Sequence, residues 1–235
     1  MRGAALDLTA PTIDIIVPTF NAAATLGATF RCLQRARDSG LVGQLTIVDG
    51  GSTDTTPDLA RAFGARLVTS ERGRGRQLAQ GAAISTAPWL LFLHADTRLL
   101  PGWEREIAAF MRRGDDRAAV FRLRLDDCAT VARMLERFVA WRTRFLGLPY
   151  GDQGLLISRH LYDTVGGFRD LPLMEDVDLV RRLGRRRVVL LDSVAETSAV
   201  RYRKRGYVAR AASNLMLLSL YFCGVPPRVL ARLYG

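Results

Sequence analysis

The decapeptide Trp89-Leu90-Leu91-Phe92-Leu93-His94-Ala95-Asp96-Thr97-Arg98 combines an apolar run with polar side chains at its end. The apolar residues are too few for a helix and do not alternate with polar ones, which is typical of a strand buried on both faces. His94 and Asp96 would point the same way, into the crevice where open α/β sheets bind ligands. A carboxylate beside an imidazole suits a divalent cation that carries a phosphorylated substrate. The alternative is a strand end at which Asp96 only starts a turn.

Length, charge and cysteine content limit the class of protein. With 235 residues and 49% hydrophobic content, the chain can form one globular domain with a full core. Lys and Arg outnumber Asp and Glu by 34 to 23, and the resulting charge of +11 favours anionic partners. The three cysteines are far apart and lack metal-ligand spacing, as is typical of reduced cytoplasmic thiols. Because no sustained apolar segment opens the chain, we expect no signal peptide and a cytoplasmic protein.

Strand and helix patterns alternate along the chain. Strands are expected at 13–17, 45–48, 66–69, 89–93, 118–125, 155–157 and 187–191, with helical patterns between most of them. This order predicts an α/β fold with a mainly parallel, Rossmann-like nucleotide-binding sheet flanked by helices. We expect a loose lead-in at 1–12, one domain at 13–205 and a C-terminal helical segment at 206–235.

One predicted helix, at 129–146, is rich in arginine and aromatic residues. Its apolar side chains recur at helical spacing and are expected in the core. They are Val131, Leu135, Phe138 and Phe145.

Polar, Gly-rich segments follow the early strands. Pro18 and Asn21 end the first strand, and Asn21 is expected to cap the next helix. Asp49 ends the second strand and opens the segment 49–56. There a carboxylate can accept hydrogen bonds from a base or ribose while glycines allow close approach. The competing interpretation is a Gly-rich turn.

Gly73-Arg74-Gly75-Arg76-Gln77 opens another helix. Glycines, arginines and a helix N-terminus together make a diphosphate site, or else a solvated basic turn.

Two later segments carry polar groups suited to an acceptor substrate and a base. The turn at 147–154 could bind acceptor hydroxyls or simply shape the chain. Glu175, Asp176 and Asp178 begin a helix, where acids complement the helix dipole. A carboxylate there could also act as a general base for an acceptor hydroxyl.

Six segments in this order resemble a family 2 glycosyltransferase of the GT-A fold, over about residues 13–205. They are Ile16-Val17-Pro18-Thr19-Phe20-Asn21, the Asp49-Gly50-Gly51-Ser52-Thr53-Asp54 region, Gly73-Arg74-Gly75-Arg76-Gln77, Leu93-His94-Ala95-Asp96-Thr97, Gly151-Asp152-Gln153-Gly154 and Met174-Glu175-Asp176-Val177-Asp178-Leu179. The resemblance implies transfer of a sugar from a nucleotide-sugar to an acceptor hydroxyl, with inversion at the anomeric carbon. We expect the donor to be UDP-linked.

The resemblance also implies roles for residues. Asp49 would contact the donor's base, Asp96 would hold a Mn²⁺ or Mg²⁺ ion and the diphosphate, and Asp176 would be the base, with Glu175 beside it. The chain departs from the family pattern at one point: the usual Asp-X-Asp motif reads His94-Ala95-Asp96, so His94 is a second candidate metal ligand.

The expected donor and cofactor site comprises Pro18, Thr19, Asn21, Asp49, Gly50, Asp54, Arg74, Arg76, Gln77, His94, Ala95, Asp96 and Arg201. Arg201 lies in a segment that is similar to the Gln-X-X-Arg-Trp element of processive members but lacks its Gln; a plain basic surface run is the alternative. The expected acceptor residues are Tyr150, Asp152 and Gln153.

The C-terminal segment contains 17 residues without a charge, at 211–227. A helix packed on the domain is expected, and an interfacial helix on an anionic lipid surface, at the inner face of the cell membrane, is the alternative.

Two other functions compete with this interpretation of the sequence. A nucleotidylyltransferase should carry a Gly-rich, Arg-containing loop after the first strand, where this chain has Pro18-Thr19-Phe20-Asn21. A basic nucleic-acid-binding protein should expose aromatic residues among its basic ones. Here most aromatic residues lie in apolar runs, so nucleic acid is not the expected partner.

Overall fold

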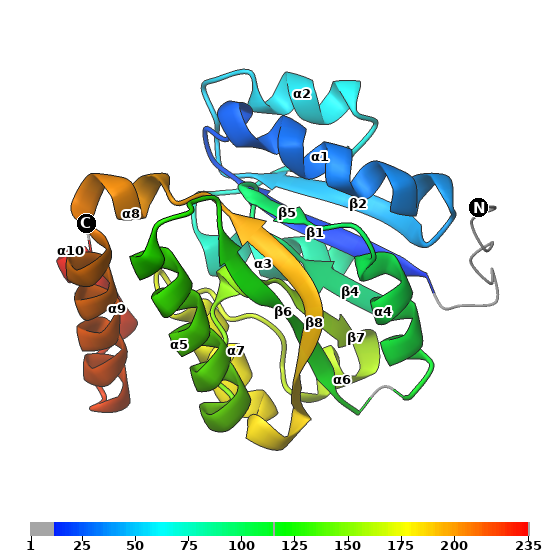
Figure 1. Ribbon diagram of the computed structural model, residues 1–235. Coiled ribbons are helices and arrows are strands. Elements are labelled where there is room, and N and C mark those ends of the chain that lie inside the picture. Colours follow the sequence, from blue (N-terminus) through cyan, green and yellow to red (C-terminus); the bar gives the residue numbers. More distant parts are fainter. Residues whose placement is uncertain (1–11, 115, 235) are drawn as a thin grey trace.

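The computed structural model describes residues 12–114 and 116–234, with the side chain of Arg201 excepted, and forms one α/β domain (Figure 1). Most of the expected lead-in, residues 1–11, therefore lies outside the described residues. Within the described chain, eight strands form one sheet in the order β3-β2-β1-β4-β7-β6-β8-β5. The strands are β1 (Ile13–Thr19), β2 (Val42–Asp49), β3 (Arg66–Thr69), β4 (Trp89–Phe92), β5 (Thr97–Leu99), β6 (Ala118–Leu125), β7 (Leu155–Ser158) and β8 (Val188–Thr197).

Helices connect and cover these strands. They are α1 (Ala23–Asp38), α2 (Thr56–Ala62), α3 (Arg74–Ile84), α4 (Trp103–Met111), α5 (Thr130–Leu146), α6 (Arg159–Thr164), α7 (Glu175–Leu183), α8 (Val200–Arg205), α9 (Tyr207–Phe222) and α10 (Pro227–Tyr234), with 3₁₀ turns η1 (Gly151–Gln153) and η2 (Arg185–Arg187). The α/β class with a mainly parallel sheet, predicted from the alternation, is confirmed.

Strand direction places the site. Strands β3, β2, β1 and β4 are mutually parallel, so their carboxyl ends meet at one edge of the sheet. β7 runs antiparallel to β4 and to β6, and β8 lies parallel to β6. The short β5, which sequence patterns did not reveal, pairs antiparallel with the end of β8. Residues after β4 are thereby brought next to residues after β8.

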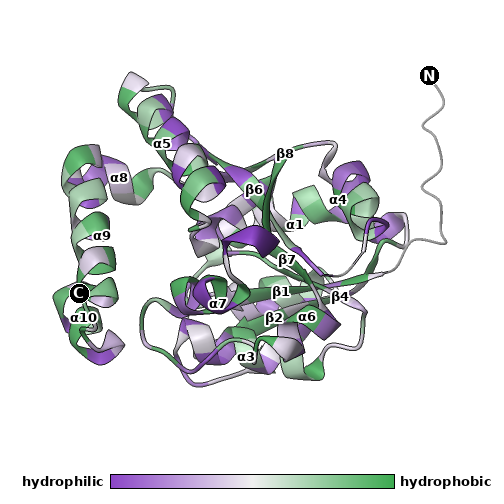
Figure 2. Cartoon of the chain, turned by 90° about the horizontal axis from the view of Figure 1, so that it is seen from below, coloured by the Kyte–Doolittle hydropathy of each residue, from purple (hydrophilic) through white to green (hydrophobic). Residues whose placement is uncertain are grey.

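Two apolar layers cover the sheet, and strand alternation divides residues between them. Ile13, Ile15 and Val17 of β1 face one cluster, into which α1, α2 and α4 pack. Ile16 faces the other cluster, formed with α3, α6 and α7. In Figure 2 the strands β1, β2 and β4 appear as a hydrophobic layer between helices of mixed colour.

Helix α5 differs from the sequence prediction. Val131, Phe138 and Phe145 were expected in the core, but they are 37%, 47% and 48% exposed, and only Leu135 is partly buried against a small cluster. The helix instead buries Ala132, Val139, Arg142 and Thr143. The spacing of apolar residues separates an apolar face from a smaller, partly polar face of the helix. It could not show that the partly polar face is the one that packs on β6 and β8.

The C-terminal segment forms α9 and α10, which stand beside α8 at the edge of the sheet (Figure 1). Leu217, Leu218 and Leu230 are buried, whereas much of the remaining apolar surface is exposed. No helix in the described part of the chain combines the length and hydrophobicity needed to span a bilayer.

Gly81 in α3 and Gly27 in α1 differ in how closely other atoms approach them, and this difference can be tested by substitution. A Cβ at Gly81 would lie 2.4 Å from Ile16 Cγ2 and 3.1 Å from Val48 Cγ2, so Gly81→Ala should overpack this layer and cost about 1–3 kcal/mol. Gly27 in α1 has only Arg31 Nη1 at 3.8 Å, so Gly27→Ala is the matched control and should stabilise by up to about 1 kcal/mol. Urea unfolding would measure both, and equal stability changes would contradict this packing.

Candidate active site

A pocket enclosing about 880 Å³, its open mouth included, lies where the carboxyl end of β4 meets α7 and the C-terminal helices. This size is ordinary for a small-molecule site. The pocket brings together seven residues expected from the sequence: Arg74, His94, Asp96, Tyr150, Asp152, Glu175 and Asp176.

His94 and Asp96 occupy the turn between β4 and β5. Both side chains are half-buried and line the pocket, as their position after the buried strand predicted. The Thr97 N–H donates to the His94 carbonyl at 3.1 Å and closes the turn. Ala95 points its carbonyl the other way, to the Thr29 hydroxyl at 2.9 Å.

The loops after β1 and β2 interlock beside this pocket. Asp49 is 5% exposed, and its carboxylate accepts hydrogen bonds from the Thr19 hydroxyl, the Gly51 and Ser52 N–H groups and the Ser52 hydroxyl, at 2.5–3.1 Å. A carboxylate offers about four acceptor positions, so Asp49 holds its own loop in shape.

Asn21 and Asp54 complete the interlock. Asn21 does not cap α1, contrary to the prediction: it has a φ of +48°, and its Oδ1 accepts from the Thr53 N–H at 2.9 Å. The exposed Asp54 accepts from the N–H groups of Ala23 and Thr56, and its hydrogen bonds to Thr56 lower its pKa. Pro18 is half-buried near the end of β1, and the Gly50 N–H donates to the Thr19 carbonyl at 2.9 Å, which joins the ends of β1 and β2.

The start of α3 approaches α7 closely. A Cβ at Gly75 would lie 2.3 Å from the Arg169 carbonyl oxygen, so only glycine fits without a backbone shift. Arg74 reaches into the pocket and pairs with Glu175, with Nη1 and Oε1 3.2 Å apart.

Arg76 and Gln77, the other two side chains expected at the site from this segment, contact neighbouring parts of the fold instead of the pocket. Arg76 turns away and pairs with Glu71 and Asp170. Gln77 is buried and donates both amide hydrogens, to the Thr19 and Val48 carbonyls at 2.9 and 2.7 Å. Gln77 therefore ties α3 to β1 and β2.

Two carboxylates begin α7, behind a residue in the left-handed region. Met174 has a φ of +65°, which is uncommon for a non-glycine residue and often marks a functional site. Asp176 accepts hydrogen bonds from the Gly151 N–H at 2.6 Å and from its neighbour Val177 N–H at 2.8 Å. Glu175 is 2% exposed; burial raises its pKa, the charge of Asp176 raises it further and Arg74 opposes both.

Gly151 joins the two sides of the pocket. A Cβ there would lie 2.7 Å from His94 Nε2 and 3.3 Å from Asp176 Oδ2, so both groups crowd one small space that only glycine leaves open.

The turn around η1 rests on the inner face of α5. The Arg142 guanidinium lies 3.6 Å from the Tyr150 ring centre, and burial raises the pKa of Tyr150. Burial, opposed by Arg142, raises the pKa of Asp152 to about 6, and its buried Oδ1 has no hydrogen-bond partner among the described residues. Gln153 does not line the pocket: it is fully buried and bonded to Thr143 and to the Phe121 carbonyl.

The C-terminal helices supply a wall that sequence reasoning missed. Arg210 donates to the Tyr234 hydroxyl at 3.1 Å and lies over the Tyr202 ring, whose hydroxyl pKa burial raises to about 12. Asn214 and Leu217 follow Arg210 at helical spacing and also line the pocket. That spacing was the available signal. Arg201 lies in α8, and its side chain is outside the described residues.

The sheet order, the loops after β1 and β2 and this pocket define a GT-A fold, and solved structures agree. The crystal structure of glucosyl-3-phosphoglycerate synthase from Mycobacterium tuberculosis, with Mn²⁺, UDP and glucosyl-3-phosphoglycerate, matches with a TM-score of 0.63 at 20% identity, over 96% of this chain and 87% of that one. Residues 1–349 of S. aureus TarS in complex with UDP match with a TM-score of 0.62 at 17% identity, over 80% of this chain and 61% of that one.

Sequence comparison names the family. The model of glycosyl transferase family 2 matches residues 14–175, so the chain belongs to this family. This confirms the resemblance seen in the motifs and disfavours the nucleotidylyltransferase and nucleic-acid-binding alternatives.

Named relatives match over about two fifths of the chain. A PGL/p-HBAD biosynthesis glycosyltransferase of Mycobacterium tuberculosis is 41% identical over 100 residues, which cover 39% of this chain and 38% of the relative. A validoxylamine A glucosyltransferase of Streptomyces hygroscopicus subsp. jinggangensis is 34% identical over 99 residues, covering 39% of this chain and 23% of the relative. The matched region is thus well under half of either relative.

The raised pKa of Asp152 predicts a pH-dependent cost. Its carboxyl has a pKa of about 6 in the folded chain against an ordinary pKa of 3.8, so between these pH values the folded state holds a proton that the unfolded state has lost. Stability should fall as pH rises from about 4 to 6, by up to about 3 kcal/mol from this group. Asp152→Asn should remove that fall.

Urea unfolding at pH 4.5 and pH 7 would measure it. Asp58→Asn is the control because the Asp58 side chain is 77% exposed, and it should follow the parent at both pH values. A parent and an Asp152→Asn variant that change in parallel with pH would show that Asp152 is not desolvated.

Proposed function

We propose that the protein transfers a sugar from a UDP-linked donor to an acceptor hydroxyl with inversion, assisted by a divalent cation. The observation that carries this proposal is the meeting of Asp96, Arg74 and Asp176 in one pocket at the carboxyl edge of the sheet. Solved structures of the same fold contain UDP with Mn²⁺ or Mg²⁺, which supports both the donor and the cation.

Asp96, with His94 beside it, fits a cation held jointly with a diphosphate. No group of three or more His, Cys, Asp or Glu residues among the described residues could hold a metal alone. Mg²⁺-type sites commonly use one or two carboxylates plus substrate phosphates, and a lone Asp96 meets that need. When bound, the cation would offset negative charge on the leaving diphosphate.

Arg74 is the arginine placed to assist. Its guanidinium lies in the pocket, while Arg76 is engaged with Glu71 and Asp170. We therefore assign the diphosphate contact to Arg74 and a supporting role to Arg76. The role proposed for Asp49 is contact with the base or ribose, in which the nucleotide would replace the Thr19 or Ser52 hydroxyl as a donor, because the loops already occupy its four acceptor positions.

Asp176 is the proposed base. Each of its oxygens accepts one backbone hydrogen bond, which fixes the carboxylate and leaves further acceptor positions for a hydroxyl. Glu175 is less suited because it is buried and paired with Arg74. Tyr150 and Asp152, on the same wall, are proposed acceptor contacts; the acceptor hydroxyl would lose its proton to Asp176 as it attacks the anomeric carbon and the diphosphate leaves.

Removal of the cation ligand should uncouple nucleotide binding from metal. In Asp96→Ala, Mn²⁺ should no longer strengthen UDP binding in calorimetry, while UDP without metal should bind as it does to the parent. His94→Ala is the comparison, and a smaller loss is expected if His94 is only a neighbour of the ion. If a chelator leaves UDP binding by the parent unchanged, the cation has no part in it.

Removal of the base should slow turnover without weakening the binding of the donor nucleotide. Asp176→Asn keeps size and shape but cannot accept a proton, so kcat should fall by about 10²–10⁴-fold while UDP affinity hardly changes. Glu175→Gln should lose less, through its contact with Arg74. Steady-state kinetics and calorimetry on both variants test this, and near-parent turnover in Asp176→Asn with a large loss in Glu175→Gln would make Glu175 the base.

A further inference from the structure

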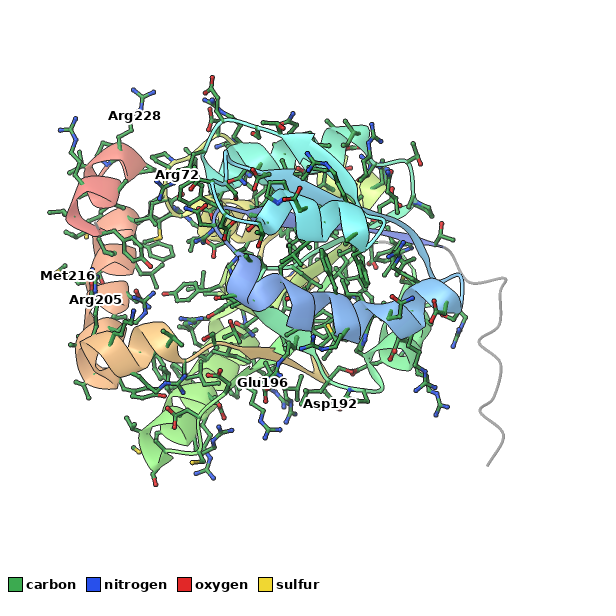
Figure 3. All side chains as sticks on the ribbon, turned by 90° about the horizontal axis from the view of Figure 1, so that it is seen from above. Arg72, Asp192, Glu196, Arg205, Met216 and Arg228 are labelled. Atoms are coloured by element: carbon green, nitrogen blue, oxygen red, sulfur yellow. The ribbon has the colours of Figure 1, made fainter. Side chains whose placement is uncertain are left out.

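Exposed apolar side chains are concentrated on one side of the molecule. Among the described residues, the large hydrophobic side chains that are strongly exposed lie on α5 and α8–α10, with Phe20 as the one exception. They are Val131, Met134, Phe138, Trp141, Phe145, Leu146, Val200, Val208, Leu215, Met216, Phe222, Val229 and Leu233. We call this set the apolar face. Figures 1 and 3 both place these helices on the same side of the domain.

Helix α5 carries the most ordered part of the apolar face. Five exposed side chains recur at intervals of three and four residues and so form a single stripe along the helix: Val131, Met134, Phe138, Trp141 and Phe145. Met134 is 64% exposed, Trp141 50%, and Phe138 and Phe145 almost as much. The three aromatic rings follow one another along the helix, with centroids 6.0 and 6.1 Å apart.

The apolar face continues onto α9. Val208, Leu215 and Phe222 recur every seven residues on its outer side, while Leu217 and Leu218 are buried on its inner side. Figure 2 shows α9 as largely hydrophobic although it lies at the margin, and Figure 3 shows Met216 and Arg205 at that margin. Arg203 and Tyr207 hold the start of α9 to Asp127, just before α5, so the two parts adjoin.

Basic residues border the apolar face. Helices α5 and α8–α10 contain eleven basic residues and one acidic residue, which is most of the net charge of +11. The one acid, Glu136, is already engaged by Arg133 and the Leu125 N–H. Arg137 and Arg144 are exposed, follow the stripe on one side and form no ion pair within the described chain.

We propose that this face binds the surface of an anionic lipid bilayer, with α5 lying in the interface. Aromatic and aliphatic side chains beside arginines on one helix are what interfacial helices use, since the rings enter the acyl boundary and the arginines contact acidic headgroups. A second copy of the chain is a poorer occupant because a symmetric contact would place the same unpaired arginines against one another.

The inner face of α5 connects this surface to the site. Arg142 lies over Tyr150, and the Thr143 hydroxyl donates to Gln153, so the helix that meets lipid also supports the turn that lines the pocket. Docking through α5 thus holds the pocket within about one helix diameter, roughly 10 Å, of the headgroups.

Tryptophan fluorescence can test the contact directly. Trp89 and Trp103 are 3% and 1% exposed, so a change on adding vesicles reports on Trp141. With vesicles containing about 30% phosphatidylserine in phosphatidylcholine, the emission should shift to the blue and brominated acyl chains should quench it. The protein should sediment with these vesicles and be released by salt, as expected for an electrostatic contribution. Because this experiment contains no substrate, a negative result would count against lipid binding alone and not against the proposed sugar transfer.

Matched variants assign the binding. Phe138→Ser with Phe145→Ser should reduce vesicle partitioning by on the order of tenfold or more, because two exposed rings lose their apolar burial. Arg137→Gln with Arg144→Gln should weaken it about fivefold per charge on phosphatidylserine only. Phe20→Ser removes an equally exposed ring elsewhere and should bind vesicles like the parent. Circular dichroism would establish that each variant is folded.

Three results would overturn the proposal. The first is a parent that neither sediments nor shifts its fluorescence with anionic vesicles. The second is vesicle binding that survives Phe138→Ser with Phe145→Ser, because α5 would then not be the contact. The third is a stable dimer in light scattering that this double variant dissociates, because the apolar face would then belong to a second copy.

Discussion

The close approach of α3 to α7 is the contact on which the site depends. Gly75 lets the backbone of α3 touch the Arg169 carbonyl, and Arg74 then reaches the buried Glu175. Because Glu175 is buried while Arg74 is 41% exposed, removing Arg74 would leave a buried carboxylate without its cation, and this pairing therefore holds the start of α3 to α7. Through this contact Arg74 and the carboxylates of α7 face one pocket, although they are about a hundred residues apart in the chain.

A second constraint acts across the pocket at Gly151. Its N–H fixes Asp176, and its missing side chain leaves room for His94 and Asp176 to approach. The expected cation ligand and the expected base are thus positioned by one backbone residue. Met174, just before α7, has a strained left-handed backbone conformation that this arrangement tolerates. The side chains of Gln77 and Asp49 form hydrogen bonds that hold the loops after β1 and β2 in shape.

Sequence patterns predicted the sheet, the order of the loops and seven residues of the pocket, because these depend on local signals: a buried run before His94, glycines beside Asp49 and acids at a helix start. They failed where tertiary contacts decide. The three residues of β5 are too few to show a pattern. The apolar stripe of α5 faces outward because Arg142 and Thr143 face inward, and no local rule gives that choice. Arg210, Asn214 and Tyr234 enter the pocket only because α9 and α10 fold back against it.

We propose a donor site for a uridine nucleotide and a divalent cation. It is tested most directly by thermal unfolding of the parent protein with UDP, GDP, ADP and a nucleoside triphosphate, each with Mn²⁺ or with a chelator. Ligands that bind the folded state raise the melting temperature in proportion to their affinity. We expect the largest rise in melting temperature for UDP and its sugar conjugates with Mn²⁺, and a smaller rise with the chelator. A larger rise with the nucleoside triphosphate, or none with any diphosphate, would contradict it.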